Sequence, residues 1–260
     1  MGDVVSVQGP DRAGIARVVL DRPPANALDG AFIAGLEATA QGLAGAPGLR
    51  VVVVASAIPG VFMAGADLGF IQANWHRIDE VATGLRAALG AWAGLAVPTI
   101  GALSGHALGG GCELALTLDF RCMARGRGRI GLPEAQRGLL AAGGGTQRLA
   151  RLVGPGRALD LALRGRVLDA DEAERIGLVT TACDAGDLEA TVEALAGELA
   201  GLAPRTVAAT KAVIRAGVER PLEEALTMEI DAMVALAATD DAAEGVRSFL
   251  EGRAPRFTGR

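Results

Sequence analysis

Hydrophobic residues gather in short runs along the first half of the chain, and these runs predict strands. Residues 4–8 and 15–20 lie between glycine and proline signals and predict the two strands of a hairpin. Arg50–Ser56 contains four consecutive valines, and Pro98–Leu103 is a second apolar run, as is typical of strands buried on both faces. Phe120–Ala124 predicts one more strand.

Apolar residues at helical spacing fill most of the remaining chain. Asp29 is suited to cap a helix in which Phe32, Leu36 and Leu43 share one face. Two prolines exclude the preceding segment, 21–26, from any helix. A long helical region is predicted from Leu68 to about residue 95, and a glycine-rich turn at 104–111. Further helices are predicted at 112–118, 146–152, 158–163, 171–176, 188–202, 206–216, 222–238 and 241–251. This alternation of strand, turn and helix favours the α/β class.

The last helices differ from the others because one of them has an unusually broad apolar face. Its stripe is widened by alanines and consists of Leu222, Leu226, Ile230, Met233 and Val234. That is more apolar surface than one docking face needs, so the pattern fits either an ordinary buried helix or a subunit interface. Strand signals end near residue 202. We therefore divide the chain into a core at 1–202, which would hold the active site, and a helical oligomerisation region at 203–260.

The composition excludes several classes of protein. The chain has 260 residues, of which 50% are hydrophobic and 21% charged, so it is not disordered. A net charge of −5 excludes a broad basic surface for nucleic acid or an anionic membrane. The cations are arginines except for Lys211. No apolar run reaches the roughly 18 residues of a membrane span.

Cysteine usage and the N-terminus bear on the compartment. Three cysteines without C-x-x-C spacing make neither a disulfide framework nor a zinc site, and they favour a reducing compartment. We see no secretory signal, and we interpret the short myristoylation pattern at Met1–Ser6 as a chance match. These features predict a cytoplasmic protein.

Two glycine-rich turns follow buried strands and carry candidate chemistry. Val51–Val54 leads to Ala64–Asp67, and Thr99–Leu103 leads to Gly109–Glu113. Small residues let a ligand approach the main chain, and a helix start adds free N–H groups with partial positive charge. Two such N–H groups facing one point would form an oxyanion hole. Neither turn matches a phosphate-binding loop, and an ordinary turn is the alternative for each.

Two glutamates complete the candidate chemistry. Glu113 lies in the first turn of a predicted helix, and Glu134 follows Pro133, 21 positions later. An acid and a base on either side of one water can add or remove that water. We expect the helix dipole to keep Glu113 ionised and its charge to keep Glu134 protonated. The alternative is a helix-end glutamate and an unrelated surface glutamate.

Other chemistries have weaker support. Only two histidines are present, His76 and His106, and no G-x-S-x-G elbow accompanies them, which argues against a catalytic triad and a metal site. Arg125, Arg127 and Arg129 form an Arg-Gly-Arg-Gly-Arg turn that could contact RNA or phosphate. A solvated turn fits these arginines better.

Taken together, the motifs resemble those of the crotonase family, the enoyl-CoA hydratases and isomerases. They keep their order and spacing over nearly the whole chain, and jointly they are specific although each alone is weak. The matching stretches are 22–28, 62–68, 105–115, 132–134, 144–149 and 249–257. The resemblance implies an α/β spiral of ββα units followed by a C-terminal helical trimerisation region. It also implies homotrimers, often paired into homohexamers, and an acyl-CoA thioester ligand.

The resemblance also implies roles for particular residues. The N–H groups of Ala66 and Gly110 would hold the thioester oxygen. Glu113 would be the base toward a water that attacks Cβ, and Glu134 would deliver a proton to Cα, so that a trans-2-enoyl-CoA is hydrated. No metal or redox cofactor is expected, since coenzyme A is part of the substrate. Arg253 or Arg256 would reach the CoA phosphates, either within one chain or across a subunit boundary. The CoA pocket would be lined by Ala25, Ala27, Leu28, Ala64, Asp67 and Leu68.

Two other functions stay open at this point. A double-bond isomerase, or another crotonase-type reaction on an acyl-CoA, could work with one carboxylate. A non-catalytic RNA-binding or assembly protein could use the same fold through the Arg125–Arg129 turn. Two departures from the family pattern bear on activity. Ala141–Gly145 stands where the family often has Pro-Gly-Ala-Gly-Gly, and the stretch between the glutamates is one residue longer near that arginine turn.

Overall fold

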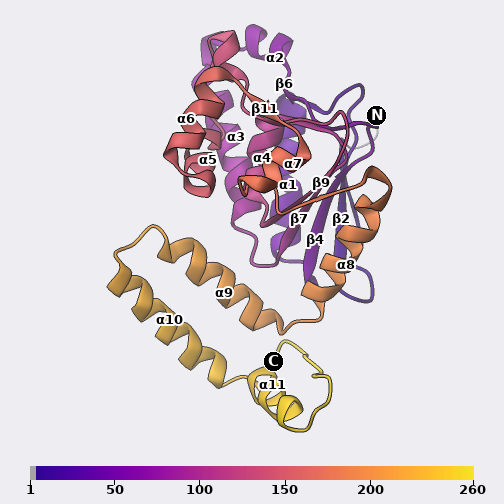
Figure 1. Cartoon of the computed structure of the whole chain (residues 1–260), viewed down its shortest axis with the longest axis vertical. Coiled ribbons are helices and arrows are strands. Elements are labelled where there is room, and N and C mark those ends of the chain that lie inside the picture. Colours follow the sequence, from indigo (N-terminus) through magenta and orange to yellow (C-terminus); the bar gives the residue numbers. More distant parts are fainter. Residues whose placement is uncertain (1–3) are drawn as a thin grey trace.

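A six-stranded sheet forms the centre of the molecule (Figure 1). The computed structural model describes residues 4–260, so half of the myristoylation pattern lies outside it. The first two strands form the predicted antiparallel hairpin, and the others run parallel. All five predicted strands lie in this sheet, and of its six strands only the last in the chain was not predicted. In spatial order the strands are β1 (Val5–Gln8), β2 (Ile15–Leu20), β4 (Val51–Ser56), β7 (Thr99–Leu103), β9 (Phe120–Ala124) and β12 (Thr181–Cys183).

Two smaller sheets were not predicted, because strands of two or three residues are too short to show a period. One is four-stranded, in the order β11 (Val167–Leu168), β10 (Ile130–Gly131), β8 (His106–Leu108) and β5 (Val61–Met63). The other pairs β3 (Ala27–Leu28) with β6 (Gly65–Ala66). The expected turn at 104–111 therefore contains a strand, since β8 is paired on both sides.

The chain repeats one path through these sheets, which is the predicted spiral. A strand enters the large sheet, the next enters the four-stranded sheet, and helices follow. This occurs for β4 with β5, for β7 with β8, and for β9 with β10. The repeated path brings the chain back each time to the same corner, where β6, β8 and the helix after β8 meet.

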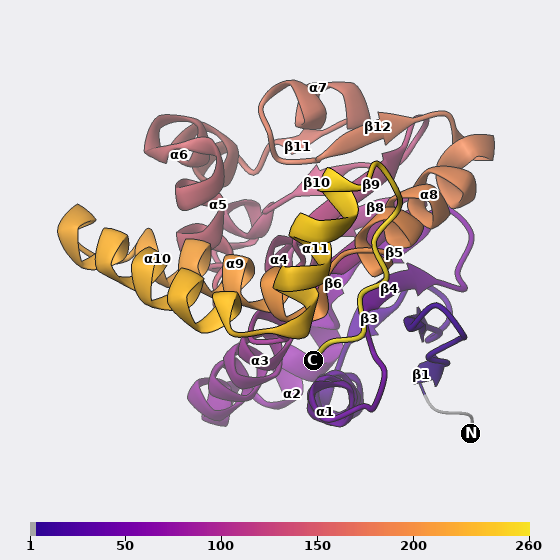
Figure 2. The ribbon, with the colours of Figure 1, turned by 90° about the horizontal axis from the view of Figure 1, so that it is seen from below.

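Helices cover both faces of the large sheet (Figures 1 and 2). One face packs against α8 (Leu188–Ala200) through Val51, Val53 and their neighbours. The alternate valines, Val52 and Val54, face the larger core on the other side. That core is covered by α1 (Gly30–Ala44), α3 (Ile78–Ala93) and α4 (Gly110–Thr117). The prediction of strands buried on both faces is confirmed.

The long helix expected from Leu68 to about residue 95 is wrong in one respect. It is divided into α2 (Leu68–Ala73), a 3₁₀ turn η1 (Trp75–Arg77) and α3. Asn74 causes the break, because its side-chain amide donates to the carbonyl of Phe70 at 2.8 Å and its oxygen accepts from Arg77. A polar side chain that bonds its own backbone competes with the helical ladder.

Three helices lie between β10 and β12, and three more end the chain. The first group is α5 (Gly145–Val153), α6 (Pro155–Arg164) and α7 (Ala170–Arg175). The second is α9 (Pro204–Gly217), α10 (Leu222–Ala237) and α11 (Asp240–Leu250). Figure 1 shows the α9–α10 hairpin standing away from the core. Neither of these two helices has a buried residue, so α10 is no ordinary buried helix within one chain. Within residues 4–260, no helix is long and apolar enough to cross a membrane.

Candidate active site

Strand β6 and the start of α4 meet so closely that only glycine fits between them. A Cβ on Gly110 would lie 2.4 Å from Leu28 Cδ1, and one on Gly65 would lie 2.8 Å from the carbonyl oxygen of Leu108. Gly65 also has a φ of +100°, which other residues rarely adopt. These glycines bring the main chain at Ala66 next to the main chain at Gly110.

The N–H groups of Ala66 and Gly110 are both free of the local hydrogen-bond ladders. Asp67 N–H donates to the carbonyl of Leu28 at 2.9 Å, and Leu28 is paired with Ala66. In a parallel ladder, the N–H of the residue paired in this way points to the other side of its strand. Gly110 begins α4, so its N–H has no acceptor one turn earlier. The structure thus brings the two predicted oxyanion donors to one corner.

The carboxyl group of Glu113 lies in a cradle made by the loop before α5. Glu113 is only 2% exposed, and its Oε1 accepts the N–H of Gly145 at 2.8 Å. A Cβ on Gly143 would lie 2.9 Å from Oε2, and one on Gly145 would lie 2.9 Å from Oε1. The departure at Ala141–Gly145 therefore includes the residues that hold this carboxylate, and sequence reasoning missed this contact.

Burial raises the pKa of Glu113 to about 7, although the Gly145 N–H opposes the shift. Desolvation of the buried carboxylate thus acts against the ionised form that we expected the helix dipole to favour, and at a pKa of about 7 both forms are populated near neutral pH. The charge of Glu134 raises the pKa of Glu113 further. A carboxyl group that exchanges its proton near pH 7 is suited to act as a base and as an acid.

Glu134 begins the 3₁₀ turn η2 (Glu134–Arg137) and lies against the start of α4. A Cβ on Gly109 would lie 2.8 Å from Glu134 Oε1. Its other oxygen, Oε2, is buried and has no hydrogen-bond partner among the described residues. Burial raises the pKa of Glu134, so it favours the protonated form as expected. The cause differs from the expected one, since desolvation and not the charge of Glu113 dominates.

An apolar cavity of about 410 Å³ borders Glu134. Its wall includes Leu132, Leu139, Ala141 and Leu159, from the chain after β10 and from α6. The reading of two unrelated glutamates is wrong for this structure, because one shared corner holds both carboxyl groups and both free N–H groups.

The predicted CoA-lining residues gather around the β3–β6 pair. Leu28 is buried beneath Gly110, whereas Ala64 and Leu68 are exposed, and Ala25 and Ala27 are half-buried. Asp67 has a different local role: its side chain caps α2 by accepting Phe70 N–H at 3.1 Å, and it lies 3.5 Å from Arg22.

The C-terminal arginines do not reach this corner within one chain. Arg253 forms ion pairs with Glu244 and Glu251, each at 2.6 Å. The helix that precedes it, α11, lies at the opposite end of the molecule from α2 and β6 (Figure 1). The guanidinium of Arg256 has no ion pair among residues 4–260. A contact with CoA phosphates would therefore have to come from another subunit.

The arginine turn folds back on its own surroundings. Arg125 pairs with Asp171 at 2.8 Å and Asp184 at 3.3 Å. Arg129 donates to the carbonyls of Gly126 and Gly128. Only one of the three arginines is thus left without such a contact within the described chain, which argues against an RNA site. Across residues 4–260, no group of three or more His, Cys, Asp or Glu side chains could hold a metal ion.

Sequence reasoning also missed a buried polar hub at Asn26. This residue is fully buried with a φ of +51°, and its amide donates to Ser56 Oγ at 2.8 Å and to the carbonyl of Phe62 at 2.9 Å. The available signal was the residue type after two prolines, since asparagine tolerates the left-handed conformation.

The spiral of strand pairs and helices with its C-terminal helical region is the crotonase type of fold, and the relatives of this chain agree. The family model for enoyl-CoA hydratase/isomerase matches residues 11–260. A probable enoyl-CoA hydratase of Mycobacterium leprae is 36% identical over 99% of both chains. A crotonyl-CoA hydratase of Syntrophomonas wolfei is 35% identical over 94% of both. The crystal structure of an enoyl-CoA hydratase of Bacillus anthracis has a TM-score of 0.94 at 33% identity, and covers 99% of this chain and 100% of its own. The chain belongs to the enoyl-CoA hydratase/isomerase family.

Proposed function

We propose that this protein adds water across the double bond of a trans-2-enoyl-CoA and releases a 3-hydroxyacyl-CoA. One observation carries the proposal: the fold places two carboxyl groups with raised pKa values beside two free main-chain N–H groups. Hydration needs a base for the water, an acid for Cα and donors for the thioester oxygen, and this corner offers all of them. The names of the relatives point the same way.

In the proposed mechanism, Glu113 takes a proton from the water whose oxygen attacks Cβ. The electron pair of the double bond moves toward the thioester, and Ala66 and Gly110 N–H stabilise the resulting enolate oxygen. Glu134, whose pKa is raised by burial, delivers its proton to Cα. One oxyanion donor contributes about 3–4 kcal/mol, and acid–base catalysis contributes about 10²–10⁴-fold. No metal or redox cofactor takes part in these steps.

The proposal is tested by the loss of the conjugated-thioester absorbance when the protein is mixed with crotonyl-CoA. We expect turnover by the natural chain and a fall of about 10²–10⁴-fold in Glu113→Gln and in Glu134→Gln. Glu80→Gln is the matched control, because that side chain is 69% exposed on α3. Full activity in both site variants would contradict the proposal. Isomerase activity that survives in Glu113→Ala would assign the protein to the isomerases instead.

We also propose that the chain works as a homotrimer or homohexamer in the cytoplasm. The cytoplasm is supported by the cysteines, which are free thiols, as a reducing compartment requires.

Assembly is supported by the apolar face of α10, since Leu222, Ile230 and Met233 are all exposed. Analytical ultracentrifugation would test the assembly, and Ile230→Asp should shift the chain toward monomers because it places a charge on this face. A natural chain that sediments as a monomer at micromolar concentration would contradict it.

A further inference from the structure

Strand β6 carries the Ala66 N–H, yet its sheet is very small. The β3–β6 ladder pairs only Ala27 with Gly65 and Leu28 with Ala66. An isolated two-stranded sheet is marginally stable at best in water. An oxyanion donor must also keep its position closely, since a misplacement of about 1 Å can cost on the order of 100-fold in rate. Contacts outside the ladder must therefore fix β6.

Packing against α4 and Leu108 supplies some of these contacts, and the guanidinium of Arg22 supplies others. One of its nitrogens donates to the carbonyl of Ala27 at 2.8 Å, in β3. The other donates to Asp29 Oδ2 at 2.6 Å and lies 3.5 Å from Asp67 Oδ2. Asp67 directly follows Ala66, so a single side chain connects both strands of the small sheet. The Arg22 side chain is 25% exposed, and a planar fork of donors suits such a bridge better than a lysine would.

Both aspartates have a second task that limits their movement. Asp29 caps α1 by accepting Phe32 N–H at 2.9 Å through its other oxygen. Asp67 likewise caps α2 through Oδ1 and offers Oδ2 to Arg22. The guanidinium therefore joins the starts of two helices on either side of the β3–β6 pair.

The main chain of Arg22 is anchored in turn to the central sheet. Its N–H donates to Asn26 Oδ1 at 2.7 Å, and its carbonyl accepts Asn26 N–H at 2.8 Å. The buried Asn26 amide binds Ser56 at the end of β4 and Phe62 in β5. Arg22 thus connects β6, which carries the Ala66 N–H, to the strands of the central sheet.

We infer that Arg22 is a positioning residue for the oxyanion hole, and that Asp67 acts with it and not as a substrate contact. This inference rests on the proposed function only in treating Ala66 as a donor to the thioester. It assigns Arg22 no contact with substrate, because its guanidinium already serves three acceptors. Without the contacts of Arg22, the main chain at Ala66 would be free to shift away from the position of the oxyanion hole.

The test compares Arg22→Gln with Arg125→Gln. Arg125 is a matched control, since it also bridges two aspartates from separate segments, and these are in α7 and after β12, not beside β3 or β6. We expect kcat with crotonyl-CoA to fall on the order of 10- to 100-fold in Arg22→Gln, with KM and Tm changed little. Arg125→Gln should keep its kcat. Arg22→Lys should recover only part of the loss.

A spectroscopic readout separates positioning from stability. In a Glu113→Gln background, where substrate is not consumed, the infrared carbonyl stretch of bound [1-¹³C]crotonyl-CoA reports how strongly the oxygen is held. We expect the Arg22→Gln change to move this band toward that of the free thioester, and the Arg125→Gln change to leave it in place. A band and kcat unchanged by Arg22→Gln would overturn the inference, as would a loss of kcat that only follows the unfolded fraction. If the natural chain binds crotonyl-CoA without hydrating it, the proposed function fails, and a band moved by Arg22→Gln still supports the inference.

Discussion

Helices α8 and α10 have similar apolar stripes but opposite surroundings. Helix α8 buries Leu188, Val192 and Ala196 at four-residue spacing against the large sheet. Helix α10 carries larger apolar side chains at comparable spacing, and none of them is buried. An apolar stripe therefore predicts that a helix packs against something, but it does not predict which surface the helix packs against. For α8 the partner is the same chain, and for α10 we propose that it is another subunit.

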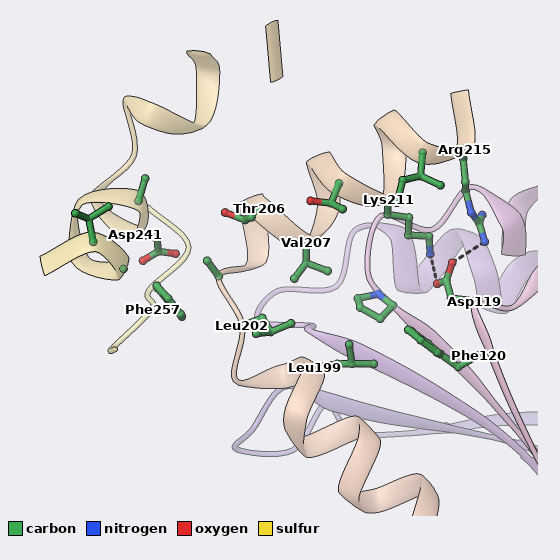
Figure 3. Close-up of a pocket in the computed structure, with 17 residues that line it drawn as sticks. Asp119, Phe120, Leu199, Leu202, Thr206, Val207, Lys211, Arg215, Asp241 and Phe257 are labelled. Atoms are coloured by element: carbon green, nitrogen blue, oxygen red, sulfur yellow. Dashed lines mark hydrogen bonds and ion pairs between the residues drawn. The ribbon is translucent and has the colours of Figure 1, made fainter. Parts of the chain in front are cut away.

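The C-terminal helices also differ from α8 in the kind of contact that attaches them to the core. Where α9 meets the core, Lys211 and Arg215 of α9 point toward Asp119 of the core (Figure 3). Asp119 binds Lys211 at 2.6 Å and Arg215 at 2.8 Å, and Arg215 also donates to the carbonyls that end α3 and α4. Beside this cluster lies an apolar pocket of about 660 Å³ between α9, α11 and the core. The core is thus held by apolar packing, and the C-terminal helices are fastened to it by a half-buried ion-pair cluster.

The largest expected difference is between two phenylalanines. Phe32 in α1 is 0% exposed, and Phe249 in α11 is 84% exposed. Phe32→Ala should lower the free energy of unfolding by about 3–5 kcal/mol, because it removes buried contacts and leaves a cavity. Phe249→Ala should change it by less than about 0.5 kcal/mol. Urea unfolding at concentrations where the chain is monomeric measures both, and equal losses would contradict the contrast between the regions.

The core and the C-terminal region should also differ in how their stability depends on pH, and Glu113 represents the core. Burial raises the pKa of Glu113 to about 7 from its ordinary value of 4.5. The contribution of this group to the free energy of unfolding is therefore fully present below pH 4.5, the ordinary value, and it is lost as the pH rises through about 7. Glu113→Gln has no titrating group here, so its free energy of unfolding should not fall over this range. The natural chain should lose roughly 3 kcal/mol relative to the variant by pH 8. A thermal-unfolding series from pH 4.5 to 8 checks this, and parallel profiles for both proteins would refute it.

Glu244 in α11 should behave in the opposite sense. Hydrogen bonds from Arg253 and Arg247 lower its pKa. Its contribution is present above pH 4.5, the ordinary value, and is lost as pH falls below it. Acidification should therefore loosen the tail around α11 before the core, which hydrogen exchange at pH 3 to 5 would measure. Protection of α11 that persists as long as that of β4 would contradict this expectation.

The smallest expected effects concern the contacts between α9 and the core. Asp119→Asn should cost about 1–3 kcal/mol and increase hydrogen exchange in α9, because Lys211 and Arg215 lose their shared partner in a half-buried site. The matched control is Glu219→Gln, which breaks an exposed pair with Arg151 at 2.6 Å. We expect this control to cost less than about 1 kcal/mol. An equal effect of the two variants would show that the buried cluster has no special part in fastening α9.

Local sequence determined the parts of the fold that depend on one stretch of chain. The valines at 51–54 gave a doubly buried strand, and Asp29 caps α1 as predicted. The break at Asn74 and the strand β8 escaped prediction. A single polar side chain decides the first, and pairing with distant strands decides the second.

Glu113 and Glu134 could be chosen from sequence as candidate residues, together with the glycines that precede them. Only the tertiary structure decided that they share one corner, that Gly143 and Gly145 cradle Glu113, and that burial sets its pKa. The same holds for the bridge made by Arg22. The physical reason is that periodicity and capping act over a few residues, whereas desolvation and side-chain contacts depend on segments that only folding brings together.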